Sequence, residues 1–388
     1  MQIFWHRGLT AMPRFAPFFC AVVATMFGIA SVAAAGVINP NISVIGQPFS
    51  RWTDAAGDPS AERATLDAGE TEFVYDDYLN PYARGFFTVA LSDEGAEVEE
   101  GYFNLLRGLP LGLTLKGGKY RVGFGKLNPV HPHANPFAER FRVMAYLPGD
   151  EAFNETGVQL SARLPIPSDW SVTASADVLK GDSFRLERPD SGAPNDPYLA
   201  EGDRSDEPRP GLVGRLAAFG QIGDRSGIEL GLTGTRGTNN VAAAARTTVV
   251  GGDAKLKLWT SPNAYVLVQG ELLHLRRDDA GWDEVAAAYT RTPRKKTGGY
   301  LYADYNFKTR YNLGASYERF RDPTDDVTNQ ALGVYAGLAL LEESTAFRID
   351  WNRYLPGMPD GASASPEAAN TLTLRAIFSM GPHKAHQF

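Results

Sequence analysis

The chain has 388 residues, of which 43% are hydrophobic, and a formal net charge of −7. This acidic balance argues against nucleic acid as a partner. Beyond the first few tens of residues no apolar run is long enough for a membrane-spanning helix, yet 40 glycines, 21 phenylalanines and 16 tyrosines recur along the whole length. This combination favours one large closed β-sheet over two soluble domains.

Residues 1–35 have the pattern of a secretory signal peptide. Arg7 and Arg14 precede or begin an apolar run, and residues 33–35 are three alanines that suit a cleavage site. Cleavage there removes both arginines, so the net charge of the mature chain becomes −9. The single cysteine, Cys20, lies in this segment, and the mature chain is therefore expected to contain no disulfide.

Residues 36–78 are expected to form a periplasmic N-terminal segment or linker, followed by a barrel domain at residues 79–388. The part that ends near Glu72 is rich in Ala, Asp, Glu and Gly. It offers little apolar surface to offset the entropy lost on ordering. The alternative is that this segment folds into the barrel as a plug, which would leave a structural or adhesive role.

Two-faced segments follow, in which apolar and polar residues alternate as they do in a half-buried strand. Their number and length predict an all-β fold, a transmembrane up-and-down antiparallel β-barrel of about 14 strands with a range of about 12–16. The segments are 81–91, 97–106, 111–124, 157–164, 171–179, 211–222, 227–235, 252–259, 264–275, 299–307, 312–320, 330–340, 346–354 and 371–380.

The connections between these segments alternate in length. Short ones are typical of the periplasmic end of a barrel and long ones of the extracellular end, with both chain termini on the periplasmic side. A barrel of this size leaves an aqueous channel unless something fills it, and the loops at 129–156 and 183–210 are candidates to fold inward and narrow it. Short connections fall near 108–110, 165–169, 223–226, 260–263, 308–311 and 341–344, and long ones near 129–156, 183–210, 278–296 and 356–369.

The alternation also assigns faces. Leu301, Tyr305, Phe347 and Ile349 share the parity expected to face lipid, and the intervening polar residues are expected to face the lumen. Both signs of charge occur on that inner face, so we expect it to hold water. The lumen-lining candidates are Glu99, Lys116, Asp177, Glu229, Lys255, Lys257, Asp304, Glu318, Arg348, Asp350 and Arg375.

The last segment is apolar on one parity and polar on the other, and the chain ends in Phe388. Outer-membrane barrels are similar at their carboxyl end. This resemblance implies that Phe378 and Phe388 belong to the signal that the barrel-assembly machinery recognises.

Several short motifs extend the resemblance over both ends and the first third of the chain. They are residues 39–46 (NPNISVIG), 80–83 (NPYA), 98–103 (VEEGYF), 118–128, 131–133 (HPH), 136–137 (PF), 149–151 (GDE), 154–157 (NETG) and 381–388 (GPHKAHQF). With them the chain resembles a family of porin-like proteobacterial outer-membrane proteins, often labelled zinc-regulated outer-membrane receptors and similar to siderophore porins. The barrel would begin too early for the globular plug of energy-coupled receptors.

His131 and His133 flank a proline at the start of a long loop, with Asp150, Glu151 and Glu155 later in that loop. Two imidazoles with carboxylates can bind zinc or a similar ion, although loop histidines that bond to neighbouring backbone are the commoner case. A second pair, His383 and His386, is expected at the opposite mouth of the barrel. No cofactor is expected apart from such a zinc ion.

The sequence thus predicts a porin-like channel that passes small solutes or ions passively, with outer-membrane lipid and the barrel-assembly machinery as partners and the Gram-negative outer membrane as location. The alternative is a receptor without a plug domain that binds a metal or a metal chelate. No catalytic residue is assigned. The nearest arrangement to a catalytic one, His274 with Asp278 and Asp279, has no serine nucleophile in a recognisable motif beside it.

Overall fold

The computed structural model describes residues 40–149, 151–166, 169–186, 208–286, 288–323, 326–340, 344–358 and 366–381. They belong to a unit that begins at Pro40. The predicted signal peptide, the pair His383 and His386, and the terminal Phe388 lie outside the described residues, so the predictions made for them stay predictions. Within the described ranges, no helix has the length and apolar character needed to span a membrane.

The described ranges are almost entirely β-structure, with four short 3-10 helices in the connections. The 3-10 helices are η1 (Pro110–Gly112), η2 (Pro132–Ala134), η3 (Arg142–Tyr146) and η4 (Asp182–Phe184). The strands are β1 (Asn41–Gly46), β2 (Phe49–Thr53), β3 (Thr65–Asp67), β4 (Thr71–Asn80), β5 (Ala83–Ser92), β6 (Gly95–Leu105), β7 (Thr114–Arg121), β8 (Asn154–Leu164), β9 (Trp170–Leu179), β10 (Gly211–Ile222), β11 (Ser226–Asn240), β12 (Ala245–Ser261), β13 (Ala264–Asp283), β14 (Ala288–Phe307), β15 (Tyr311–Arg321), β16 (Thr328–Ala339), β17 (Thr345–Leu355) and β18 (Ala369–Met380).

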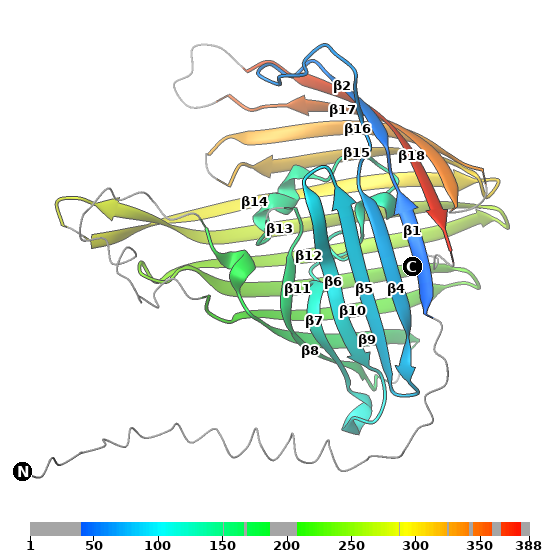
Figure 1. Cartoon of the computed structure of the whole chain (residues 1–388), viewed down its shortest axis with the longest axis horizontal. Coiled ribbons are helices and arrows are strands. Elements are labelled where there is room, and N and C mark those ends of the chain that lie inside the picture. Colours follow the sequence, from blue (N-terminus) through cyan, green and yellow to red (C-terminus); the bar gives the residue numbers. More distant parts are fainter. Residues whose placement is uncertain are drawn as a thin grey trace, which may run out of the picture. The chain divides into compact units, whose positions relative to one another are not determined.

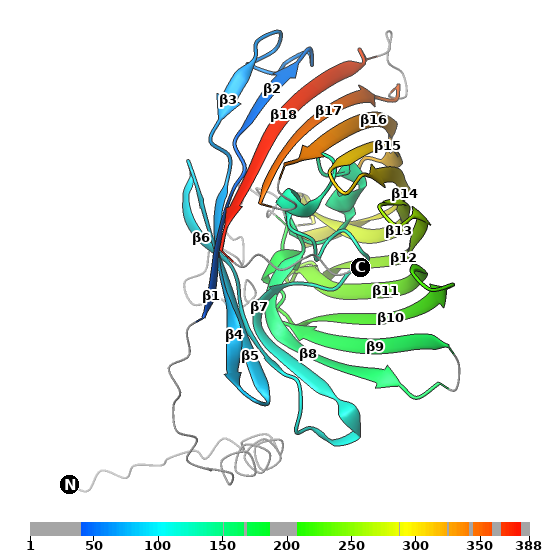
Figure 2. The same ribbon diagram turned by 90° about the vertical axis from the view of Figure 1, so that its right-hand side faces the viewer.

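Sixteen of these strands form a closed antiparallel barrel (Figures 1 and 2). From β4 to β18 each strand pairs with the next one along the chain, and β1 closes the ring. Val44 of β1 lies opposite Met380 of β18, and Asn41 lies opposite Asp76 of β4. The remaining two, β2 and β3, form an extra hairpin outside the ring, in which β2 pairs with the first half of β18. The prediction of a closed barrel is confirmed, and the count of fourteen is two strands too low.

The two missing strands lie in the segment that was predicted to be a linker. Its described part, from residue 40 to residue 78, instead forms β1, β2, β3 and most of β4. It therefore belongs to the wall, and the idea that this part fills the lumen as a plug is wrong. Strand β1 is short, with Ile42 exposed and Ile45 buried, and so it shows too few alternations to be recognised without its partners.

The two faces of the wall differ as the alternation predicted. Leu301 and Ile349 are 53% and 45% exposed on the outer face, whereas their chain neighbours Tyr300 and Asp350 are 4% and 5% exposed. In an empty barrel the inward residues would be exposed to water. Their low exposure therefore means that other protein atoms cover them. The outward apolar residues form the kind of wall that a bilayer requires.

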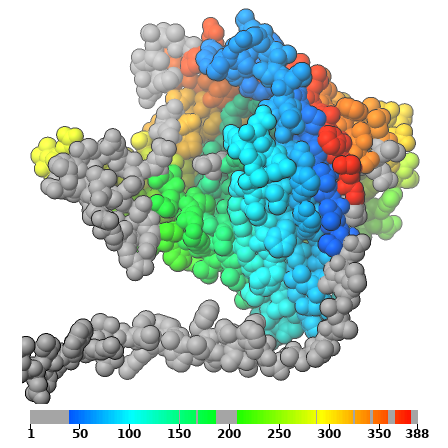
Figure 3. All heavy atoms as spheres, viewed as in Figure 1, coloured from blue at the N-terminus to red at the C-terminus, as the bar shows by residue number. Residues whose placement is uncertain are grey.

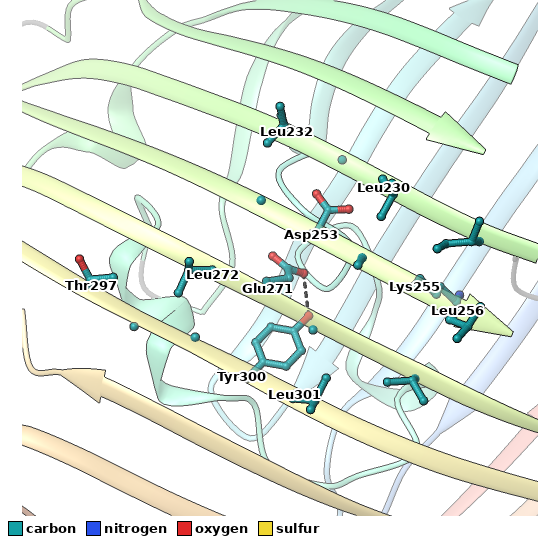
Figure 4. A pocket seen from close by; sticks show the side chains of 18 of the residues that line it. Leu230, Leu232, Asp253, Lys255, Leu256, Glu271, Leu272, Thr297, Tyr300 and Leu301 are labelled. Carbon is teal, nitrogen blue, oxygen red and sulfur yellow. Dashed lines mark hydrogen bonds between the residues drawn. The ribbon is translucent and has the colours of Figure 1, made fainter. Parts of the chain in front are cut away.

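Outer-wall leucines lie over glycines of the neighbouring strand. A Cβ on Gly252 would touch Leu232, and one on Gly299 would touch Leu272 (Figure 4). The leucine side chains therefore extend over the neighbouring strand. The result is an apolar outer surface across β11 to β14, where lipid chains can pack.

The connections at one end of the barrel are short, as predicted, and include the turns between β10 and β11 and between β12 and β13. The prediction of a long loop at residues 278–296 is wrong. There β13 and β14 continue as a paired hairpin up to Asp283 and Ala288, with Trp282 packed against Tyr289. Beyond the barrel rim both faces of this hairpin can meet water, so its sequence needs no apolar alternation.

An arginine in place of Leu301 should destabilise the barrel, because its charge would face the hydrocarbon layer. The expected cost is about 2–4 kcal/mol near the midplane. Urea unfolding in lipid vesicles measures it, with Leu301→Met as the matched control, which should change stability little. Equal stability of the two variants would contradict the assignment of this face to lipid.

Candidate functional site

A long connection between β7 and β8, residues 122–153, folds into the barrel, as the sequence suggested for the 129–156 region (Figure 2). We call it the lumen loop; its residue Asp150 lies outside the described residues. The main buried apolar cluster lies between this loop and the inner wall. Phe141 stacks on Tyr300 with ring centroids 4.2 Å apart, and Phe137 meets Tyr302 edge-on at 5.2 Å. Inward aromatic residues thus give the loop an apolar surface to pack on.

Soon after it leaves β7, the loop contacts Glu271 of β13. The backbone N–H groups of Lys126 and Leu127 each donate to Glu271 Oε1 at 2.8 Å, and the Tyr300 hydroxyl donates to the same oxygen at 2.7 Å (Figure 4). Gly125 has φ of 63°, and a Cβ there would overlap the Glu271 carboxylate. This position therefore needs glycine for both its conformation and its close approach.

Asn128 joins the two ends of the loop. Its amide nitrogen donates to the carbonyl oxygens of Val122 at 2.8 Å and Phe153 at 2.9 Å, and its side-chain oxygen accepts from the Phe153 N–H at 2.9 Å. The side chain is buried. These bonds add to the backbone bond from the Val122 N–H to the Phe153 carbonyl oxygen and give the Phe153 N–H a partner where β7 and β8 separate.

Two arginines of the far wall hold the middle of the loop. Arg375 of β18 donates to the carbonyl oxygens of Ala138 at 2.6 Å and Pro132 at 3.2 Å. Arg348 of β17 donates to the carbonyl oxygen of His133 at 2.9 Å. Asp350 accepts from the Ala138 N–H at 3.3 Å. Charge-assisted hydrogen bonds of this kind are about twice as strong as neutral ones.

A further wall carboxylate, Glu318 of β15, holds the second half of the loop. Its oxygens accept from Arg142 Nη1 at 3.1 Å and from the Val143 N–H at 3.3 Å. Next to it, the Tyr146 hydroxyl donates to the Arg321 carbonyl oxygen at 2.7 Å and accepts from the Arg321 N–H at 3.0 Å. These attachments lie on β13, β15, β17 and β18, which are close together in the ring.

The other residues predicted to line the lumen also have inward partners. Lys116 lies 4.6 Å from the centre of the Tyr102 ring, and Lys257 lies 4.3 Å from the centre of the Tyr265 ring. Asp177 accepts a hydrogen bond from Tyr120 at 2.8 Å, and Asp304 accepts one from Asn312 at 2.9 Å. Glu229 pairs with Lys126 and stands opposite Lys255 in the sheet. Of these, Glu229 contacts the loop, through Lys126, and the others contact wall residues.

A β-bulge turns two adjacent carboxylates inward. The register of β5 and β6 shifts between Thr88 and Val89, which leaves Glu99 as an extra residue beside Glu100. Both glutamates are therefore buried on the lumen side, at 8% and 6% exposure. Alternation alone would have sent one of them to the lipid.

The predicted pair His131 and His133 lies against these carboxylates and against Glu72 of β4. His131 Nε2 is 2.9 Å from Glu100 Oε2, and its Nδ1 is 3.2 Å from Glu72 Oε2 and 3.3 Å from Glu99 Oε2. His133 Nδ1 is 2.9 Å from Glu72 Oε1. The partners of both histidines are thus wall residues.

Glu155, one of the carboxylates that the sequence suggested as a partner of the histidines, bonds elsewhere. Glu155 accepts instead from the backbone N–H and the hydroxyl of Ser183, at 2.8 Å and 2.9 Å. Sequence reasoning missed Glu72 and Glu271 as contacts of the loop. An acidic residue on the inward parity of an otherwise apolar strand was the available signal for Glu271. Glu72 had none, because its strand was read as linker.

The carboxylates affect titration near the loop. Burial alone would lower the pKa of His131, but contacts with Glu100, Glu72 and Glu99 raise it well above its ordinary value. Burial, together with the charges of Glu99 and Glu72, raises the pKa of Glu70 to about 7. The surroundings of the histidine pair therefore carry an excess of negative charge.

Two other predicted sites can be placed. Phe378 lies on the outer face, 43% exposed, where its ring covers Gly46 of β1 at the seam of the barrel. His274 bonds to Thr297 at 2.8 Å and receives a bond from Arg276 at 3.3 Å, while Asp279 binds arginines. Within the described ranges, the hydroxyl that bonds to His274 belongs to a threonine and not to a serine.

Comparison with known proteins gives a fold but no activity. No protein-family model matches the chain. A protein of Aquifex aeolicus (strain VF5), described as uncharacterized, is 32% identical over 252 residues, which is 62% of this chain and 51% of that protein. The chain thus spans about half the length of the curated relative that it matches.

Similar solved structures are outer-membrane channels. The channel DcaP of Acinetobacter baumannii has a TM-score of 0.57 at 10% identity, over 91% of this chain and 100% of that one. Salmonella typhi OmpF, in complex with daunomycin, has 0.53 at 10% over 88% and 97%. The anion-selective porin from Comamonas acidovorans has 0.52 at 9% over 88% and 99%. At these identities the likeness shows that the barrel fold is shared.

Replacing Arg375 by methionine should loosen the middle of the lumen loop. The variant loses charge-assisted hydrogen bonds worth about 1.5–3 kcal/mol each, so amide exchange at residues 132–138 should become about tenfold faster or more. Hydrogen–deuterium exchange with mass spectrometry measures this. Arg353→Met, on the exposed face of β17, is the matched control and should leave exchange unchanged. Unchanged exchange in Arg375→Met would contradict the role of this arginine.

Proposed function

We propose that the chain is a porin-like channel of the Gram-negative outer membrane that passes small polar solutes or ions passively. The observation that carries the proposal is a closed ring of sixteen strands with an apolar outside and a charged inside. Barrels of about sixteen strands enclose an aqueous channel, which loops can narrow. Here the lumen loop supplies that narrowing.

Water-accessible charges beside the loop support a passage there. The side chains of Arg51, Glu139 and Arg142 keep 33%, 27% and 32% of their surface exposed, and the loop residue Glu139 lies 3.7 Å from Arg51 and 3.6 Å from Arg142. Arg142 also lies 4.5 Å from the centre of the Tyr354 ring. A strip with both signs of charge suits small polar solutes that carry either or both charges.

The placement of the histidine pair favours a channel over a surface receptor. His133 is 6% exposed and lies inside the barrel, bonded to Glu72. A receptor for a metal chelate would need its recognition groups where a chelate can reach them. No reaction is assigned, because a passive channel requires none.

Conductance in a planar bilayer tests the proposal. The refolded protein should give discrete, steady current steps. A variant in which a short Gly-Ser linker replaces residues 129–147 should conduct severalfold more, because the narrowing is gone while the wall remains. Silence from barrels whose folding is verified by heat-modifiable mobility would refute the channel function.

Ion selectivity tests where the passage lies. The double variant Arg51→Glu and Arg142→Glu reverses two charges of the accessible strip and should shift the reversal potential in a salt gradient toward cations. Arg353→Glu, on the exposed face of β17, is the matched control. Equal shifts in both variants would mean that the strip beside Glu139 does not line the route.

A further inference from the structure

Three buried ligand atoms meet where the lumen loop touches the wall. His131 Nδ1 lies 3.2 Å from Glu72 Oε2 and 3.3 Å from Glu99 Oε2. None of these three atoms has a hydrogen-bond partner, although Glu72 is fully buried. Ligands about 2.0–2.1 Å from a tetrahedral zinc ion are about 3.3–3.4 Å from one another. The two separations from His131 Nδ1 match that value.

Each of the three groups is fixed through its other polar atom. Glu72 Oε1 bonds to His133 at 2.9 Å, Glu99 Oε1 to Arg121 at 2.5 Å, and His131 Nε2 to Glu100 at 2.9 Å. A carboxylate on the far nitrogen of a histidine sets its tautomer and is the usual support of a metal-binding imidazole. With Nε2–H donating to Glu100, Nδ1 keeps its lone pair, and this nitrogen lies within 3.3 Å of the two carboxylate oxygens.

The net charge around His131 also favours binding of a cation. Three buried carboxylates, Glu72, Glu99 and Glu100, face one guanidinium, that of Arg121. With the neutral imidazole that metal binding requires, these groups carry two net negative charges, whereas an imidazolium at His131 would leave one; either charge is costly away from water. One divalent cation balances them. The donors, one nitrogen and two oxygens, suit zinc and similar first-row metals.

We propose that Glu72, Glu99 and His131 form a divalent transition-metal site that fastens the lumen loop to the wall. Glu100, His133 and Arg121 are its positioning residues. The imidazole of His133 is also near, since donor atoms of Glu72, His131 and His133 all lie within 4.8 Å of one another. Because two ligands come from β4 and β6 and one from the loop, the metal joins parts of the chain that are far apart in sequence.

Zinc titration of the folded barrel tests the site directly. After treatment with EDTA, the detergent-refolded chain should bind one Zn²⁺ in calorimetry. Glu100→Gln should bind it about 10–100-fold more weakly and Glu72→Gln more weakly still. His274→Ala, which alters a histidine on the outer face, is the matched control and should bind normally. Affinity that is the same in Glu72→Gln and the parent chain would overturn the proposal.

X-ray absorption at the zinc edge tests the site on the parent chain alone, so it does not depend on whether a variant folds. The parent chain should show a shell of nitrogen and oxygen at about 2.0–2.2 Å. A spectrum of fully hydrated zinc would mean that His131 is held as an imidazolium by its carboxylates, and would overturn the site. Zinc should also slow amide exchange at residues 132–138. This measurement detects attachment of the lumen loop to the wall and does not depend on conductance.

The effect of zinc on conductance rests on the proposed channel function. With the loop fastened, current steps should fluctuate less in micromolar zinc, and this effect should be absent in Glu72→Gln. Silent bilayers with intact zinc binding would refute the channel and leave the site standing. Steady conductance without zinc binding would refute the site and leave the channel standing.

Discussion

Hydrogen bonding of the backbone inside a bilayer is the constraint on which this structure depends. Every strand of the wall needs partners on both sides, since lipid offers none, and the sheet must therefore close. The short strand β1 meets this requirement at the seam, because it pairs with β18 on one side and β4 on the other. Beyond Gly46 the chain continues into β2, which pairs with the first part of β18 and, on its other side, with β3.

Closure by itself leaves a wide interior, and the lumen loop is built into that space. Its contacts fall on four sectors of the wall: β4 and β6 through the histidines, β13 through Glu271, β15 through Glu318, and the pair β17 and β18 through Arg348 and Arg375. Because attachments on opposite sides oppose one another, the loop cannot shift toward one wall without losing bonds at another. The width of the space left in the lumen therefore depends on where the wall residues hold the loop.

The interior combines apolar packing with an unusual number of buried charges. Such charges are costly unless each has a partner, and a buried ion pair contributes more to geometry than to stability. Several of the partners are backbone groups of the loop, as at Glu271 and Arg375, so these pairs fix where the loop lies. The three atoms of Glu72, Glu99 and His131 that remain without hydrogen bonds depart from this rule, and a cation would restore it.

The sequence by itself determined the class of fold and the inner and outer faces, because both follow from alternation within one strand. Leu301 and Ile349 could be placed outside, and Asp304 and Arg375 inside, without any knowledge of their neighbours. Tertiary structure decided what depends on pairing between distant segments. Strand β1 exists only through β4 and β18, the bulge at Glu99 only through its register with β5, and the partners of His131 only because the lumen loop crosses to β4 and β6. Such contacts join residues far apart along the chain, and a local pattern carries no record of them.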